Sequence, residues 1–157
     1  MKLDIGAGRA KYLDYVTVDN DPSVGADICI DIEKATLNDF GFCNVAEIRA
    51  HHILEHFKPE NKVKIMALFW DLLEDGGVLD IEIPLFPHPA SVQDPTHLSF
   101  WCVESFRYFI KDDALGEAFA KRYSQYPVPL FNKELDWYRG DIKPYWAYGI
   151  RLIKKVK

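Results

Sequence analysis

Cysteine is scarce in this sequence. The chain has three cysteines, Cys29, Cys43 and Cys102, which are odd in number and widely spaced. Such a set fits neither a disulfide framework nor a Cys-x-x-Cys metal clip. We therefore expect reduced thiols, as in a cytoplasmic protein.

The sequence also lacks long apolar runs and an excess of positive charge. No stretch approaches the roughly 18 apolar residues that a membrane-spanning helix needs, and the chain begins with strand-like residues instead of a signal sequence. The net charge of −5 argues against a broad nucleic-acid surface, because duplex affinity comes largely from Lys and Arg. We therefore expect a soluble, cytoplasmic protein that partners neither membranes nor nucleic acid.

The size and composition are those of one globular domain. A chain of 157 residues can bury a substantial core without a disulfide or metal staple. Its hydrophobic content of 48% lies in the globular range. We treat residues 1–157 as a single domain.

Short apolar runs bounded by turn residues predict the strands of a sheet. These runs lie at 3–5, 15–19, 28–32, 45–50 and 78–83, and later strands are expected around 131–138 and 145–156. The strongest helix signal falls between the fourth and fifth runs, where an apolar stripe follows Pro59 and ends before Gly76-Gly77. A second helix is predicted over 103–110.

The connections between the first three strands are too short for ordinary crossover helices. Residues 6–14 and 20–27 leave room for about one turn each. A parallel strand covered on both faces reads as continuously apolar, whereas the fifth run alternates, with Asp80 and Glu82 between apolar neighbours. We therefore predict an α/β sheet with one packed face and one polar, largely uncovered face.

The most informative motif is a glycine turn at the end of the first strand. The sequence Asp4-Ile5-Gly6-Ala7-Gly8 lets the backbone turn sharply and approach a ligand, and Asp19 closes the second strand. A carboxylate at that strand end can accept both ribose hydroxyls. The dinucleotide fingerprint would require a glycine at position 11, which is a lysine, so the pattern predicts a nucleoside ligand and disfavours pyrophosphate.

Over roughly residues 2–110 the chain resembles the class I S-adenosylmethionine-dependent methyltransferases, especially small methyltransferase-domain proteins. Besides the glycine turn and Asp19, the likeness rests on motifs in the family's order, at Asp31, 52–57, 73–79, 94–97 and 104–106. The resemblance implies a Rossmann-like sheet, mostly parallel with an antiparallel last strand and here with reduced helices. It also implies S-adenosylmethionine as the cofactor.

The resemblance assigns the methionine part of the cofactor to the glycine turn. The backbone at Gly6, Ala7 and Gly8 would border this part, and Asp4 would lie near its ammonium group. The helix that usually follows the turn is missing. We therefore expect the cofactor to be more exposed than is usual in this family.

The adenosine part falls, by the same resemblance, to residues at the ends of the next strands. Asp19 would bind the ribose hydroxyls, and Asn20 would lie against the adenine. Asp31 would accept a hydrogen bond from the exocyclic amine, with Ile32 lining the pocket and His51 bordering the cofactor. A carboxylate for a diol and an acceptor for an amino group are what adenosine requires.

The segment His52-x-x-Glu55-His56 has three interpretations. It spells the inverted zinc-protease motif, although that motif belongs on a helix and Pro59 follows within three residues. Ubiquinone-pathway O-methyltransferases look similar, with Glu-x-x-Glu-His that holds a divalent ion, but His52 replaces the first glutamate here, so we expect no metal. In the third interpretation the segment is structural, and Glu55 and His56 form local hydrogen bonds.

Asp94-Pro95-Thr96-His97 lies on the loop beyond the fifth strand, where substrates approach the cofactor in this family. Methyl transfer from a reactive sulfonium mainly requires alignment of the nucleophile and removal of a proton near neutral pH. We therefore predict His97 and His52 as the catalytic candidates. Alternatively, His97 anchors its loop by bonding to Asp94 or to a backbone carbonyl.

These observations together predict transfer of a methyl group from S-adenosylmethionine to an oxygen or nitrogen of a small-molecule or glycan acceptor. The expected assembly is a monomer or a weak dimer. Three alternatives stay open: an S-adenosylmethionine-binding module without its own catalysis, a non-catalytic interaction protein, and, ranked lower, a metal-dependent hydrolase that uses His52, Glu55 and His56.

Overall fold

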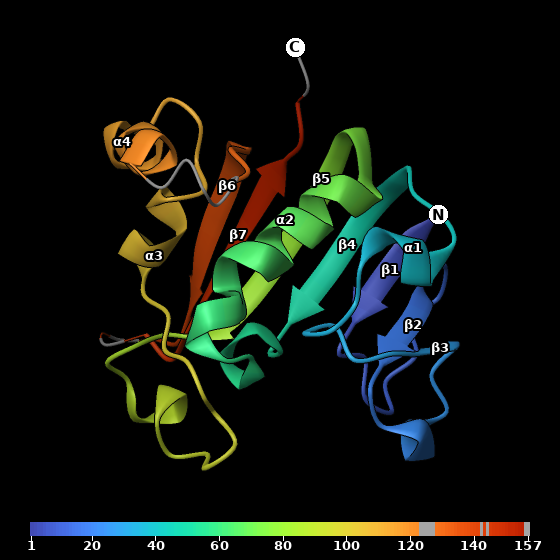
Figure 1. Ribbon diagram of the computed structural model, residues 1–157. Coiled ribbons are helices and arrows are strands. Elements are labelled where there is room, and N and C mark those ends of the chain that lie inside the picture. The colour runs from blue at the N-terminus through green and yellow to red at the C-terminus, as the bar shows by residue number, and fades with distance from the viewer. Residues whose placement is uncertain (123–127, 142, 144, 156–157) are drawn as a thin grey trace.

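A computed structural model gives the arrangement of the chain and describes residues 1–122, 128–141, 143 and 145–155 (Figure 1). In chain order the strands and helices are β1 (Lys2–Ile5), β2 (Val16–Asp19), β3 (Ile28–Cys29), α1 (Leu37–Phe40), β4 (Val45–His51), α2 (Lys62–Leu72), β5 (Leu73–Pro84), α3 (Val103–Arg107), α4 (Ala114–Arg122), β6 (Asn132–Arg139) and β7 (Ala147–Ile153).

The strands form a 7-stranded sheet in the order β3-β2-β1-β4-β5-β7-β6. Strands β1 to β5 pair in parallel, whereas β7 runs antiparallel to both β5 and β6. This arrangement confirms the predicted mostly parallel sheet with an antiparallel last strand. The chain builds outward from β1 to β3 and then returns to the other side of β1, so the order reverses between β1 and β4. Ligands of open α/β sheets bind at such a switch point.

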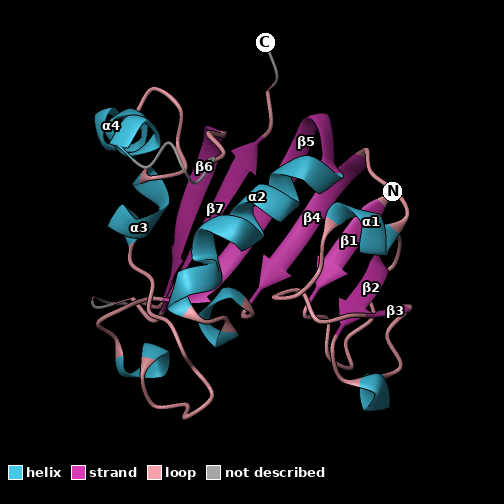
Figure 2. Cartoon of the chain, in the orientation of Figure 1, coloured by secondary structure: helices cyan, strands magenta, loops and turns pink. Residues whose placement is uncertain are grey.

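The helices of the described chain gather on one face of the sheet (Figure 2). Helix α2 lies along this face because its apolar stripe recurs at helical spacing, and Ile65, Met66, Phe69 and Leu72 are almost completely buried. They join the apolar side chains of the central strands in one core. The packed face predicted from the alternating strands is therefore present.

The opposite face is polar and carries no helix of the described chain, as predicted. Its polar side chains are paired across neighbouring strands, in the ion pairs Lys2–Glu47 and Asp4–Arg49 and in the contact between His51 Nε2 and Asp80 Oδ1 at 2.6 Å. In the two ion pairs opposite charges face one another at directly paired positions, which stabilises the register, whereas His51 reaches Asp80 diagonally. The face is less solvated than the alternation suggested, since Asp4 is 0% exposed and relies on Arg49 Nη1 at 2.8 Å from its Oδ1.

Several boundaries differ from the sequence-based prediction. Helix α2 begins three residues after Pro59, because residues 59–61 form a 3₁₀ turn, and it ends before the Gly76-Gly77 pair. Strand β3 is shorter than predicted, and α1 and α4 were not predicted. The predicted strand at 145–156 is β7, and position 156 lies outside the described residues.

Two composition-based predictions concern thiols and membranes. The three cysteines are free thiols, with Cys29 and Cys43 exposed and Cys102 partly buried. Among the described residues, the helices are too short or too polar to cross a bilayer.

Candidate functional site

A cavity of about 260 Å³ opens where β1 and β2 end and where the chain leaves β3 and β4. It is lined by Gly6, Val18, Asp19, Asn20, Ile30, Asp31, Ile32, Glu33, Ile53, His56 and Phe57. This place is the switch point of the sheet. The structure thus brings Gly6, Asp19, Asn20, Asp31 and Ile32, all predicted from the sequence, to one cavity.

The glycine turn is shaped by its contact with the segment after β4. Gly6 adopts a φ of 72°, which glycine tolerates at little cost. A Cβ at this position would lie 2.6 Å from Cγ1 of Ile53, closer than two carbon atoms can approach. Gly6 is therefore required both by its backbone conformation and by the side chain packed on it.

Asp19 ties the end of β2 to the glycine turn. Its Oδ2 accepts a hydrogen bond from the backbone N–H of Gly8 at 2.8 Å, and its Oδ1 accepts one from the N–H of Asp21 at 2.9 Å. Each carboxylate oxygen has two lone pairs, so both retain capacity for a ligand. The two amides hold the carboxylate at the cavity wall without exhausting its acceptor capacity.

Asp31 supplies a second carboxylate to the same cavity. Its Oδ2 lies 2.8 Å from Nζ of Lys34, and its Oδ1 accepts a hydrogen bond from the N–H of Glu33 at 3.0 Å. The bond to Lys34, together with the Glu33 amide, lowers the pKa of Asp31 below its ordinary value. Asp31 is therefore an ionised acceptor at neutral pH.

Four other residues of the predicted cofactor set do not line this cavity. Ala7 and Gly8 belong to the turn beside it, and the N–H of Ala7 donates to the carbonyl oxygen of Val18. Asp4 contacts Arg49 and His51 contacts Asp80 across neighbouring strands of the polar face.

Sequence reasoning missed part of the cavity wall. Ile53, His56 and Phe57 line the cavity, whereas only His51 was assigned to the cofactor from this region. The available signal was the position of the segment directly after β4, because ends of parallel strands meet at one edge. The 3₁₀ turn Leu54–His56 then brings His56 back toward β1.

The predicted catalytic residue His52 lies between two carboxylates. Its φ is 54°, its Nε2 lies 3.1 Å from Oε1 of Glu82, and its Nδ1 lies 3.6 Å from Oε1 of Glu55. Its ring stacks on Trp146. The motif therefore sits on a strand end and a short 3₁₀ turn instead of one helix face. This geometry differs from that of the inverted zinc-protease motif.

The second predicted catalytic residue, His97, lies beside the cavity wall. Its Nδ1 is 3.0 Å from the carbonyl oxygen of Ser91, and its Nε2 is 3.9 Å from Oδ2 of Asp94. Its ring packs edge-on against His56 with the centroids 4.9 Å apart. His97 thus makes the contacts expected of a residue that anchors its loop, and it also lies next to His56, which lines the cavity.

His52 is expected to make stability depend on pH. Hydrogen bonding to the carboxylate of Glu55, and to Glu82, raises its pKa above the ordinary 6.5. A raised pKa means that the stabilisation is fully present below the unfolded-state pKa and is lost as pH rises through the folded-state pKa.

The measurement compares the wild type with His52→Asn, since asparagine tolerates a positive φ. From urea titrations we expect the wild type to exceed the variant in free energy of unfolding by more at pH 6.5 than at a pH about two units higher. A difference independent of pH would contradict these ion pairs.

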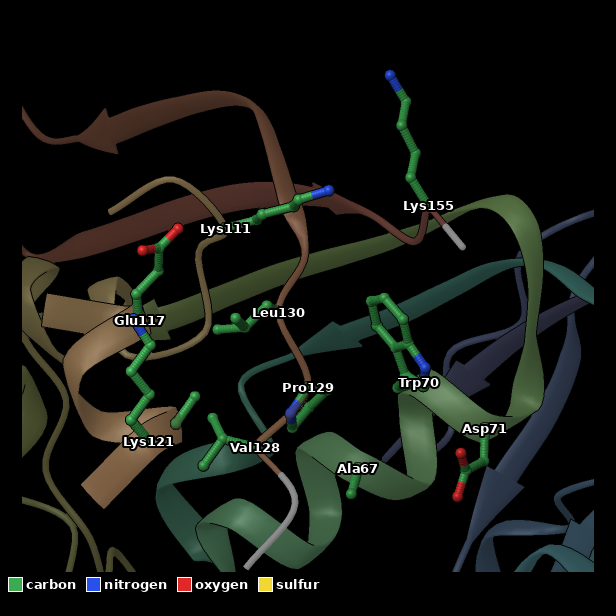
Figure 3. Close-up of a pocket in the computed structure, with 11 residues that line it drawn as sticks. Ala67, Trp70, Asp71, Lys111, Glu117, Lys121, Val128, Pro129, Leu130 and Lys155 are labelled. Atoms are coloured by element: carbon green, nitrogen blue, oxygen red, sulfur yellow. The ribbon is translucent and has the colours of Figure 1, made fainter. Parts of the chain in front are cut away.

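A larger cavity, of about 790 Å³, lies elsewhere, between α2 and α4 (Figure 3). Trp70, Val128 and Leu130 give it an apolar floor, and Lys111 and Lys121 are among the charged residues of its lining. It reaches the last turn of α2, where β5 begins, and is therefore far along the sheet from the strand ends that form the switch point. The larger cavity is therefore not the one in which the predicted cofactor residues meet.

No protein-family model matches this sequence, and no curated protein is significantly similar to it. Solved structures, however, share its fold. A methyltransferase dependent on S-adenosylmethionine, from Archaeoglobus fulgidus, has a TM-score of 0.65 at 15% identity, covering 98% of this chain and 85% of its own. The N-methyltransferase NodS from Bradyrhizobium japonicum has a TM-score of 0.66 at 13% identity, covering 99% and 85%.

A third similar structure contains ligands. The 1,6-didemethyltoxoflavin-N1-methyltransferase from Burkholderia thailandensis, with bound 1,6-didemethyltoxoflavin and S-adenosylhomocysteine, has a TM-score of 0.65 at 14% identity and covers 99% of this chain and 71% of its own. The sheet order and the switch-point cavity define a Rossmann-like α/β protein. More narrowly, the chain has the fold of the class I S-adenosylmethionine-dependent methyltransferases, which confirms the fold predicted from its sequence.

Proposed function

We propose that this protein binds S-adenosylmethionine in the switch-point cavity and transfers its methyl group to an oxygen or nitrogen of a small-molecule or glycan acceptor. The observation that supports this most is the meeting of Asp19, Asp31 and Gly6 at one cavity. Adenosine presents a diol and an amino group, and these two carboxylates can accept hydrogen bonds from both. Gly6 lets the turn pack closely against Ile53 at the cavity wall.

In this proposal each cofactor group faces a different strand end. Asp19 accepts hydrogen bonds from the ribose hydroxyls, and Asp31 accepts one from the adenine amino group. Asn20 and Ile32 border the adenine, and the methionine part follows the turn at 6–8. Asp4 and His51 act less directly, because Asp4 joins β1 to β4 through Arg49 and His51 joins β4 to β5 through Asp80.

In methyl transfer the protein itself forms no covalent bond to the substrate. The bond from the acceptor atom to the methyl carbon forms as the carbon–sulfur bond breaks, and sulfur keeps the electron pair. The protein aligns the acceptor and takes up its proton. We propose His52 and His97 for the proton, because both flank the turn that carries His56 to the cavity.

The acceptor class is supported by charge and by the named reactions of similar structures. The net charge of −5 disfavours a polyanion. Two of the similar structures are N-methyltransferases by name, and one is bound to a small heterocycle. A small neutral or cationic acceptor is therefore our first choice.

Calorimetric titration with S-adenosylmethionine and S-adenosylhomocysteine tests the cofactor, and a tritiated methyl-transfer screen against sugars, phenols and amines tests catalysis. We expect binding of both ligands and label transfer to at least one acceptor class. No heat at sub-millimolar ligand would contradict the cofactor assignment. Binding without any transfer would contradict the catalytic part and favour a binding module.

A further inference from the structure

Three side chains with metal-binding groups converge next to the proposed cofactor cavity. Glu55 and His56 come from the 3₁₀ turn after β4, and His97 comes from the loop after β5. Each offers one ligand atom, and these atoms all lie within 4.8 Å of one another. The cluster was not evident from the sequence, because His97 lies 41 positions from His56 along the chain.

The carboxylate of Glu55 is buried with one oxygen unpaired. The residue is 2% exposed, and its Oε2 has no hydrogen-bond partner among the described residues. An uncompensated buried carboxylate oxygen is costly and calls for an explanation such as a bound ion. A cation at the cluster would satisfy it.

Both histidines are oriented so that Nε2 is available to bind a metal ion. Nδ1 of His97 faces the carbonyl oxygen of Ser91 at 3.0 Å, and Nδ1 of His56 faces the carbonyl oxygen of Thr96 at 3.2 Å. Nδ1 of His56 is also 3.2 Å from Oγ1 of Thr96, whose own proton is donated to Asp94. Both nitrogens thus face acceptors, so in the neutral rings each Nδ1 carries the proton and each Nε2 keeps its lone pair. Metal-ligating histidines are typically held by this kind of bond.

The loop that carries His97 is fastened to the turn that carries Glu55. The backbone N–H groups of Leu98 and Ser99 both donate to the carbonyl oxygen of Glu55, at 2.8 and 3.0 Å. The indole N–H of Trp101 donates to the carbonyl oxygen of Leu54 at 3.3 Å. The two segments that carry the three side chains are therefore joined by hydrogen bonds outside the cluster.

We propose that Glu55, His56 and His97 bind a divalent transition-metal ion, with Zn²⁺ as the first choice. Two imidazoles and one carboxylate suit zinc and its neighbours better than Mg²⁺ or Ca²⁺. Ligand atoms on one ion with bonds of about 2.1 Å lie about 3–3.4 Å apart, so the side chains close by about 1–2 Å. Asp94, whose Oδ2 is 3.9 Å from Nε2 of His97, adds negative charge nearby.

A metal ion at this site would favour acceptors that carry a hydroxyl group, and this inference rests on the proposed methyl transfer. His56 lines that cavity, so an ion on its Nε2 adjoins the cofactor. Three protein ligands leave a coordination position for an acceptor hydroxyl, whose pKa the ion lowers. The hydroxyl proton would pass to His52 or to water, its oxygen would bind the methyl carbon, and the carbon–sulfur bond would break with its electron pair staying on sulfur. With the ion bound, His97 would be a ligand, and the proton role proposed for it above would fall to His52 or to water.

Metal binding is tested on protein freed of any affinity tag and treated with chelator. Titration with Zn²⁺ or Co²⁺ should give one equivalent of tightly bound ion, with Co²⁺ producing visible d–d absorption. Glu55→Gln and His97→Gln should each weaken binding by more than the roughly 10–100-fold cost of losing an outer-shell partner. Far-UV circular dichroism checks that both variants are folded, and Zn²⁺ protection against thermal unfolding, present in the wild type and lost in them, is the second readout.

The control variants separate this site from its rivals. His88→Asn removes an imidazole from a loop outside the cluster and should leave binding unchanged. His52→Asn distinguishes the cluster from the His52, Glu55 and His56 set of the sequence motif. Loss in His52→Asn with retention in His97→Gln would overturn the proposal, as would no binding at micromolar ion. Titration of metal-free protein with S-adenosylmethionine reports on the cofactor separately.

Discussion

Replacing Asp19 with alanine is expected to weaken S-adenosylmethionine binding by roughly 1–3 kcal/mol, or about 5- to 150-fold. The substitution removes both carboxylate oxygens that would accept from the ribose hydroxyls. It also frees the N–H groups of Gly8 and Asp21, which the carboxylate now holds at 2.8 and 2.9 Å. The cofactor therefore loses a charged acceptor and the ordered turn beside it. Isothermal titration calorimetry measures the change.

Asp21→Ala is the matched control for Asp19. It removes the same charge two residues away, from an exposed side chain that caps the short 3₁₀ turn Pro22–Val24. We expect its affinity to stay near that of the wild type. Equal losses in the two variants would point to a general field effect, and an unchanged affinity in Asp19→Ala would mean that the ribose lies elsewhere.

Gly6→Ala is expected to destabilise the protein by roughly 2–6 kcal/mol and to abolish cofactor binding. A non-glycine residue at φ 72° costs about 1–3 kcal/mol. The new Cβ also meets Ile53 at 2.6 Å, and overpacking of this kind costs about 1–3 kcal/mol more. Relief requires the turn or the segment after β4 to move, and both border the cavity. Urea titration measures the first effect and calorimetry the second.

A double-mutant cycle with Ile53 separates the two causes. Ile53→Ala removes Cγ1 and Cδ1, which would lie 2.6 and 2.7 Å from the new Cβ, but keeps its own Cβ at 2.8 Å. The double variant should therefore recover part of the packing loss and retain the backbone part. Gly8→Ala provides a second comparison, since its φ is 55° but nothing lies within 4 Å of its added Cβ. We expect it to cost about 1 kcal/mol. Additive effects of Gly6→Ala and Ile53→Ala would show that the close contact is not the cause.

Local sequence patterns were sufficient for the sheet and for much of the cavity. Residues 6 and 19 lie at strand ends, and parallel strands bring their ends to one edge whatever the details of packing. Short connections excluded helices between β1 and β3, and alternation in β5 indicated one polar face. The boundaries of α2 were less predictable, because Pro59 initiates a 3₁₀ turn as readily as an α-helix.

Contacts between distant segments were not predictable in the same way. Alternation identified the charges of the polar face but gave no register, so the pairing of Asp4 with Arg49 became visible only with the strands aligned. Helices α1 and α4 have short or weak apolar stripes and depend on tertiary packing for their stability.

The sequence by itself determined the fold class and the strand-end chemistry, because glycine conformational freedom, alternation and loop length act over a few residues. Only the tertiary structure decided which further histidine comes close to Glu55. The motif offered His52, three positions away, and its Nδ1 does lie 3.6 Å from Oε1 of Glu55, while its Nε2 faces Glu82. The fold then brings His97 to His56 from beyond β5. The reason is physical: a side-chain cluster requires proximity in space, and proximity across two strand ends depends on the packing of the whole sheet.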